Sequence, residues 1–69
     1  MEEKKLTVRS VERSLDILLC FTQKSQYKMM EIAQLTKLNK STVFRLLLTL
    51  EERGFVQRDP HTEKYSLGI

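Results

Sequence analysis

One apolar stripe in the second half of the sequence limits the fold more than any other feature. Its members follow the i, i+3, i+4, i+7 spacing that puts side chains on one face of an α-helix. Asn39 is a favourable N-cap for such a helix, and Gly54 can adopt the left-handed conformation that ends one. The pattern predicts a helix over roughly residues 40–53 with a single buried face. The stripe consists of Val43, Leu46, Leu47 and Leu50.

Two apolar repeats earlier in the chain predict helices over residues 10–22 and 29–36. Ser10 is the expected N-cap of the first helix. Residues 37–39 interrupt the helical pattern, and we expect Lys37 to take the left-handed conformation that a tight turn between two helices requires. The residues of the first helix that we expect in the core are Leu15, Leu18 and Phe21.

The periodicity changes after the third helix. Residues 55–58 and 64–67 are short runs of alternating character, and Asp59 and Pro60 between them favour a turn. This pattern predicts a β-hairpin, with a short strand near Tyr27 as a third rung. The expected fold class is mainly α with a small β hairpin, in the order of a winged helix-turn-helix: three helices plus wing.

The composition excludes several classes of protein. With one cysteine, Cys20, and one histidine, His61, the 69-residue chain has no pair for a disulfide and too few ligands for a structural zinc site. Neither residue has a marked partner for nucleophilic catalysis, so we expect no enzyme, no cofactor and no metal. The apolar runs are shorter than the roughly 20 residues of a membrane helix, and no signal peptide is visible. We expect a cytoplasmic protein without a membrane partner, in which Cys20 is a small core residue.

The positive charge is concentrated in one segment. The net charge is +3, and between Glu31 and Glu51 the chain carries Lys37, Lys40 and Arg45 but no acid. A local cationic field of this kind suits a polyanion such as DNA. A solvated helix face that lacks acids is the other interpretation.

The second and third helices match the helix-turn-helix layout, in which the second of the pair enters the major groove of DNA. Ala33 supplies the small side chain that two closely crossing helices need. Arg45 can pair bidentately with guanine, and Lys40 at the helix start is better placed for a phosphate. Phe44 can contact a thymine methyl group or pack against the second helix. The predicted DNA-binding residues of this helix are Lys40, Ser41, Thr42, Phe44, Arg45 and Thr49.

The hairpin is predicted to act as a wing on the adjacent groove or the DNA backbone. Its basic residues also have simpler interpretations, since His61 can be a solvated turn residue and Arg58 can pair with Glu63 or Asp59. Leu48 fits neither the DNA contacts nor the core, and we expect it to pack under the hairpin or to lie near a partner. The predicted DNA-binding residues of the wing are Arg58, His61 and Lys64.

A series of motifs spans residues 8–68. It comprises VRSVERSLDIL from residue 8, EIA from residue 31, LNKSTVFRLL from residue 38, LEERGFV from residue 50 and YSLG from residue 65. In this combination the chain resembles the N-terminal DNA-binding domain of the IclR family of bacterial transcription regulators. Lys37 stands where the family usually has Gly, and Asn39 where it often has Pro.

The resemblance implies a reader of operator DNA for transcription regulation, with a recognition helix over roughly residues 40–53 in the major groove and a wing over roughly 55–67. It implies a homodimer on a palindromic double-stranded site, and a C-terminal domain, absent here, that binds a small-molecule effector. We expect residues 1–9 to form a flexible arm and residues 10–69 to form one domain. This domain would belong to a longer repressor or activator, and we expect that regulator to be bound to the bacterial nucleoid. A winged-helix interaction or dimerisation module without DNA binding is the alternative.

Overall fold

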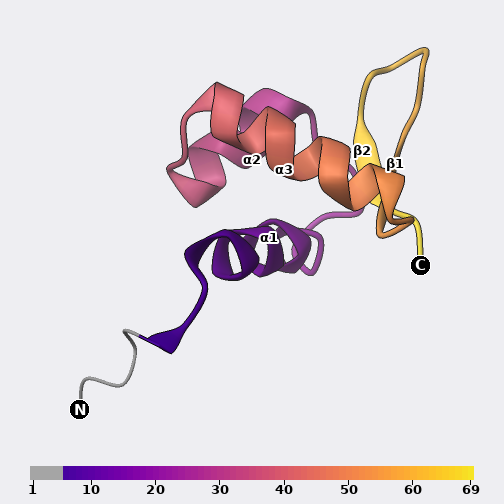
Figure 1. Cartoon of the computed structure of the whole chain (residues 1–69). Helices are drawn as coiled ribbons and strands as arrows, with labels where there is room; N and C mark the ends of the chain where they lie inside the picture. Colours follow the sequence, from indigo (N-terminus) through magenta and orange to yellow (C-terminus); the bar gives the residue numbers. More distant parts are fainter. Residues whose placement is uncertain (1–5) are drawn as a thin grey trace.

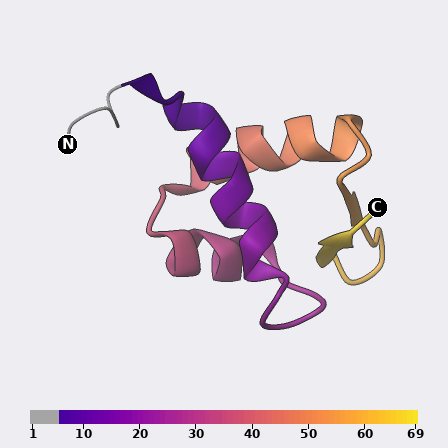
Figure 2. The ribbon, with the colours of Figure 1, turned by 90° about the horizontal axis from the view of Figure 1, so that it is seen from below.

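The computed structural model describes residues 6–69 and contains three helices followed by a two-stranded hairpin. Helices α2 and α3 lie together, α1 packs beneath them, and the hairpin stands at the far end of α3 (Figure 1). Seen from below, α1 crosses the other two helices (Figure 2). The predicted fold class, a winged helix-turn-helix, is therefore confirmed. The elements are α1 (Arg9–Cys20), α2 (Met29–Thr36), α3 (Lys40–Glu52), β1 (Val56–Arg58) and β2 (Tyr65–Leu67).

The first helix begins one residue earlier than predicted, at Arg9. Its N-cap is Val8, which offers no side-chain hydrogen bond, and the Glu12 amide already donates to the Val8 carbonyl at 3.0 Å. The Ser10 carbonyl accepts a bond from the Ser14 hydroxyl at 2.8 Å, within the helix. The prediction of Ser10 as N-cap was wrong, because the backbone bonds of α1 start before it.

The end of α1 also differs from the prediction. The helix stops at Cys20, and the amides of Phe21 and Thr22 bond to carbonyls three residues back, each at 3.1 Å. This is the pattern of a tighter last turn, so Thr22 lies outside the α-helix. Of the predicted arm at residues 1–9, residues 1–5 lie outside the described part of the chain.

The buried face of α1 is not the predicted one. Ile17 is fully buried, whereas Leu15, expected in the core, is 52% exposed. Phe21 is buried as predicted, and Leu18 packs partly buried against the core. Leu15 and Ile17 are separated by about 200° around a helix, so only one of them can face the other helices. Because α1 is apolar on both sides, the sequence pattern did not identify the correct face.

The turn between α2 and α3 has the predicted conformation. Lys37 is left-handed, with φ 61° and ψ 30°. Asn39 caps α3, because its Oδ1 accepts bonds from the Thr42 amide at 2.8 Å and the Ser41 hydroxyl at 3.0 Å. Ala33 is only 7% exposed in the core that the two helices share. These features fix the start of α3 in position.

The end of α3 is a complete Schellman motif. Gly54 is left-handed, with φ 85°, as predicted, and its amide donates to the Glu51 carbonyl at 3.0 Å. The Phe55 amide donates to the Leu50 carbonyl at 2.8 Å. These two bonds satisfy carbonyls that the helix end would leave unpaired, and they turn the chain into the hairpin.

The hairpin strands β1 and β2 pair antiparallel, and each is one residue shorter than predicted. The predicted third rung is an isolated bridge, in which Tyr27 and Tyr65 exchange backbone bonds of 3.0 and 2.7 Å. Both tyrosine side chains are buried, whereas Phe55 is 41% exposed. The sheet is thus tied to the loop before α2 as well as to α3.

The core draws on all three helices and the hairpin. None of the helices within residues 6–69 is long and apolar enough to cross a membrane. The buried side chains are Ile17, Phe21, Tyr27, Ile32, Ala33, Val43, Leu47, Leu50, Val56 and Tyr65.

We predict that Ala33→Leu lowers the free energy of unfolding by about 1–3 kcal/mol, because a buried site filled by an alanine cannot take extra methylenes without separating α2 from α3. Gln34→Leu is the matched control, since Gln34 is exposed and the added bulk stays in solvent. Urea and thermal denaturation measure both. Equal stability of the two variants would mean that Ala33 is not at a close helix contact.

A second prediction concerns the start of α2. The Glu31 carboxylate accepts a bond from the Lys28 amide at 2.7 Å and pairs with the Lys24 ammonium at 3.3 Å. The hydrogen bond from the Lys28 amide is the largest cause that lowers the pKa of the Glu31 carboxyl, and the contact with Lys24 is the second. A lowered folded-state pKa gives stability that is present above the usual glutamate pKa and is lost as the pH falls through the folded-state value.

We therefore expect Glu31→Gln to melt at a lower temperature than the wild type at pH 7, and the difference to vanish as the pH falls into the range where Glu31 is protonated. Thermal melts across a pH series measure this. The control is Glu52→Gln, whose carboxylate makes no hydrogen bond among the described residues. A difference that persists at low pH would contradict the assignment.

Candidate nucleic-acid interface

The outward face of α3 carries most of the predicted binding residues. Because Val43, Leu47 and Leu50 turn inward, the opposite side of the helix is exposed. Thr42 is half-buried, and it borders the exposed face. The exposed predicted residues are Lys40, Ser41, Phe44, Arg45 and Thr49.

Two hydroxyls on this face donate to groups within the domain. The Ser41 hydroxyl donates to Asn39 Oδ1 at 3.0 Å, and the Thr49 hydroxyl donates to the Arg45 carbonyl at 3.0 Å. A hydroxyl whose proton is used in this way presents its lone pairs outward. In this state Ser41 and Thr49 can accept from base amino groups more readily than they can donate to phosphates.

Arg45 lies beside α1. It lines a shallow groove of about 450 Å³ together with Thr42 and Thr49 of α3 and with Val11 and Ser14 of α1. Among the described residues its guanidinium makes no ion pair or hydrogen bond. A fork of donors without a protein partner is suited to a planar acceptor pair such as guanine O6 and N7.

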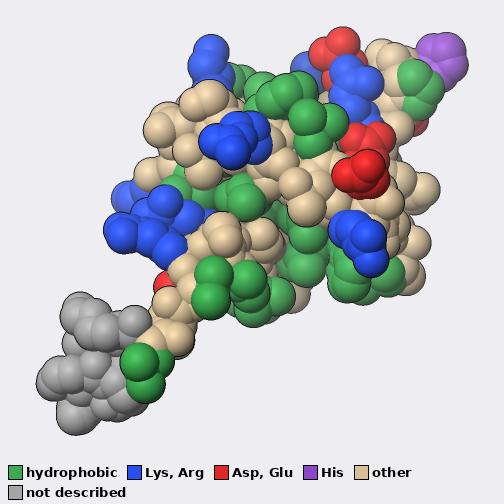
Figure 3. Space-filling model, in the orientation of Figure 1, with side chains coloured by type: hydrophobic (Ala, Val, Ile, Leu, Met, Phe, Trp, Pro, Cys, Tyr) green, Lys and Arg blue, Asp and Glu red, His purple; other side chains and the backbone are tan. Residues whose placement is uncertain are grey.

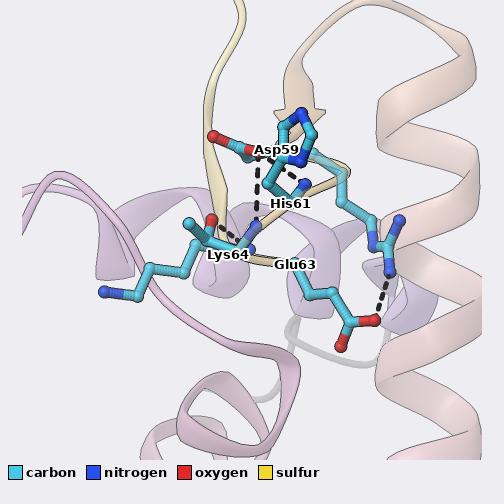
Figure 4. Close-up of polar contacts among 6 residues, drawn as sticks. Asp59, His61, Glu63 and Lys64 are labelled. Atoms are coloured by element: carbon cyan, nitrogen blue, oxygen red, sulfur yellow. Dashed lines mark hydrogen bonds and ion pairs between the residues drawn. The ribbon is translucent and has the colours of Figure 1, made fainter.

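The wing loop is held by its own hydrogen bonds (Figure 4). Asp59 Oδ1 accepts from the amides of His61 at 2.8 Å and Thr62 at 3.3 Å, which confirms its predicted role in the turn. The Asp59 carbonyl accepts from the Glu63 amide at 2.7 Å, and Glu63 is left-handed, with φ 63°. His61 is exposed and Lys64 half-buried.

Arg58 is not free. Its guanidinium lies 3.4 Å from the Glu63 carboxylate, so the simpler interpretation of this residue, an ion pair with Glu63, is confirmed (Figure 4). Both side chains are exposed, at 37% and 70%, and an exposed pair of this kind contributes little stability. Arg58 can therefore exchange Glu63 for a phosphate at small cost.

A second groove, of about 420 Å³, lies between the start of α2, α3 and the hairpin. Leu48 lines it together with residues of the hairpin and is 49% exposed, so it lies beside the hairpin without being buried by it. Lys28 also lines it, and sequence reasoning missed this residue. Its position directly before the first residue of α2 was the available signal.

Charge is unevenly distributed over this side of the molecule. Figure 3 shows the acidic side chains of this view near the C-terminal end of α3 and the hairpin, with basic side chains beside them, and basic side chains without acidic neighbours towards the start of α3. The acids of this region are Glu51, Glu52 and Glu63, all exposed. The first two turns of α3 are therefore the part of this helix that most favours a polyanion.

The surroundings of Cys20 do not favour a reactive thiol. Burial raises the pKa of its thiol, and the nearby Asp16 carboxylate adds to the effect. The thiol donates to the Asp16 carbonyl at 3.5 Å, and the side chain packs partly buried against the core. These contacts support the prediction that Cys20 is a small core residue.

Comparison with known proteins identifies the family. Residues 10–60 match the IclR helix-turn-helix domain. The HTH-type transcriptional regulator XynR of Escherichia coli (strain K12) is 41% identical over 63 residues, which cover 90% of this chain and 25% of that protein. The HTH-type transcriptional regulator TsaQ1/TsaQ2 of Comamonas testosteroni is 38% identical over 61 residues, covering 88% of this chain and 22% of that protein.

A solved structure agrees with these relatives. The crystal structure of an IclR family transcriptional regulator from Brucella abortus superposes with a TM-score of 0.90 at 38% identity, over 99% of this chain and 26% of that one. The chain thus spans about a quarter of the length of the relatives it matches. The match confirms the predicted resemblance to the DNA-binding domain of this family. The chain belongs to the IclR helix-turn-helix family.

Proposed function

We propose that this domain binds double-stranded DNA in a sequence-specific manner and thereby serves transcription regulation. The observation that carries the proposal is the exposed, acid-free start of α3, where Lys40, Ser41 and Arg45 project from a helix whose opposite face packs in the core. Relatives named as HTH-type transcriptional regulators support it.

In the proposed complex the first two turns of α3 lie in the major groove. Arg45 pairs with guanine, Ser41 and Thr49 accept from base amino groups, and Thr42 contacts a base edge or the neighbouring backbone. Lys40 contacts a phosphate near the helix N-terminus, where the backbone amides and the helix dipole also favour an anion.

The wing contacts the flanking groove or the backbone in the same complex. His61 at the loop and Lys64 on its flank supply donors, and Arg58 supplies a third when it leaves Glu63. The hydrogen bonds around Asp59 hold the loop in one conformation, which lowers the entropy that binding would cost.

We predict that Arg45→Ala lowers affinity for the preferred duplex by about 1–3 kcal/mol and relaxes the preference at one base pair. Lys40→Ala is the matched comparison, because loss of a phosphate contact weakens preferred and random duplexes alike and reduces the salt slope by about 1. A preferred duplex is first selected from a random library by enrichment sequencing at stated salt. Equal weakening of all sequences by Arg45→Ala would make Arg45 a phosphate contact.

We further propose that the protein acts as a homodimer on a palindromic operator. One winged helix makes few base contacts, and two half-sites about 34–36 Å apart place two recognition helices on one face of the duplex. α1 provides an unpaired apolar stripe for self-association: Val11, Leu15 and Leu19 are 53%, 52% and 61% exposed and follow at intervals of four residues. An effector-binding C-terminal domain and a cytoplasmic, nucleoid-bound location complete the proposal for the whole regulator.

The α1 stripe gives a direct test of dimerisation. We expect the 69-residue chain to associate weakly in a sedimentation concentration series, and Leu19→Glu to remain monomeric because it places a charge in the apolar contact. Leu35→Glu is the control, since Leu35 is an equally exposed leucine, on α2. A wild-type monomer at all concentrations that binds one half-site as tightly as a palindrome would contradict the dimer.

The same apolar surface supports the alternative, an interaction module without DNA binding. The duplex selection separates the two, because an interaction module enriches no sequence at any salt concentration.

A further inference from the structure

Three large apolar side chains lie exposed around the groove between α2, α3 and the hairpin. Met30, Phe44 and Leu48, here named the apolar patch, are 49%, 46% and 49% exposed and all line this groove. Figure 3 shows hydrophobic side chains along the upper edge of α3. Contiguous apolar side chains left in water on a small domain indicate a contact surface.

The core does not account for these residues. α3 buries Val43, Leu47 and Leu50 on one face, and that face is filled without Phe44 or Leu48. Phe44 and Leu48 are four residues apart, so they lie one above the other on the outward side of α3. Phe44 directly precedes Arg45, and the apolar patch therefore borders the residue to which we assign a base contact.

The place of the apolar patch on α3 favours DNA over an apolar protein segment, because Phe44 lies next to Arg45, for which we propose a base contact. Lys28 lines the groove at the start of α2, and Arg58 lines it from the hairpin. Arg58 and Glu63 pair with each other at 3.4 Å, which leaves Lys28 and Glu51 as the other charged residues of the groove, and Glu51 lies towards the C-terminal end of α3. The end nearest Phe44 is thus free of acid, and the hairpin projects beyond α3 on the side away from α1 (Figure 1).

We infer that the apolar patch reads C5-methyl groups of pyrimidines in the major groove. This inference rests on the proposed DNA binding. The thymine methyl is the apolar feature that base pairs display in the major groove, and an apolar side chain on a recognition helix is its natural contact. Phe44 and Leu48 meet the methyl groups, and Met30 closes the groove behind them with an adaptable side chain. A methyl group at C5 of cytosine occupies the same place, so 5-methylcytosine is recognised as thymine is.

The test removes the methyl group without changing base pairing. In the duplex selected by the 69-residue chain, each thymine is replaced in turn by deoxyuridine. We expect a loss of about three- to fivefold in affinity at one or two positions, the factor expected for burial of one methyl group. With cytosine at such a position, 5-methylation is expected to raise affinity by a similar factor.

Variants then assign the effect to the apolar patch. Phe44→Ala and Leu48→Ala are expected to bind thymine and deoxyuridine duplexes equally at the responsive position, because the methyl contact is already lost. Leu35→Ala, which removes an exposed leucine outside the groove, should keep the full response. Circular dichroism melts of each variant confirm that it is folded.

Each result of these experiments bears on a different part of the proposal. Equal affinity for thymine and deoxyuridine at every position overturns the methyl assignment, leaves DNA binding intact, and assigns the apolar patch to a protein partner. A methyl response that survives in both Phe44→Ala and Leu48→Ala overturns the assignment to these residues. Failure to enrich any duplex overturns the proposed function itself, and this inference with it.

Discussion

The packing of α3 against α2 determines which side chains this domain presents to a partner. Val43 and Leu47 are fully buried against a core that includes Ile32 and Ala33. Rotation of α3 by one residue, about 100°, would bury polar side chains and expose this stripe, so the orientation is strongly held. In the turn before α3, Lys37 adopts the left-handed conformation although it is not a glycine. Asn39 then caps the helix and fixes the first turn of α3. The exposure of Arg45 is a consequence of this packing.

The sequence predicted α2, α3 and the hairpin well because each carries a one-sided or strongly marked pattern. The i, i+3, i+4, i+7 spacing of the α3 stripe identifies its buried face although Phe44 and Leu48 lie on the outward side, and Gly54 marks the end of the helix. Leu15 and Ile17 show the opposite case, because the apolar side of α1 is wide enough to include both and only the neighbouring helices decide which of them is buried. Helix α1 is also capped by backbone bonds alone, for which no residue type is diagnostic.

The same distinction applies to the candidate site. The outward residues of α3 follow from one helix, so their exposure was predictable, whereas the groove around Leu48 needs three elements to form. The left-handed conformation of Glu63 had no signal in the sequence, because glutamate does not favour it. Yet that residue positions the carboxylate that holds Arg58. Contacts between distant segments are therefore what the sequence pattern left undetermined.

The two flanks of α3 present different side chains, Arg45 on one and the apolar patch on the other. In the proposed dimer each flank lies at a different distance from the symmetry axis. Arg45 shares its groove with Val11 of α1, and the apolar patch shares its groove with the hairpin. In a dimer formed through the α1 stripe, which includes Val11, the two Arg45 residues lie nearer to the symmetry axis than the two hairpins. The guanine contacts then fall towards the centre of a palindromic site, and the methyl contacts fall outside them. In the proposed dimer, the order of base preferences within each half-site follows from which neighbour, α1 or the hairpin, lies beside each flank of α3.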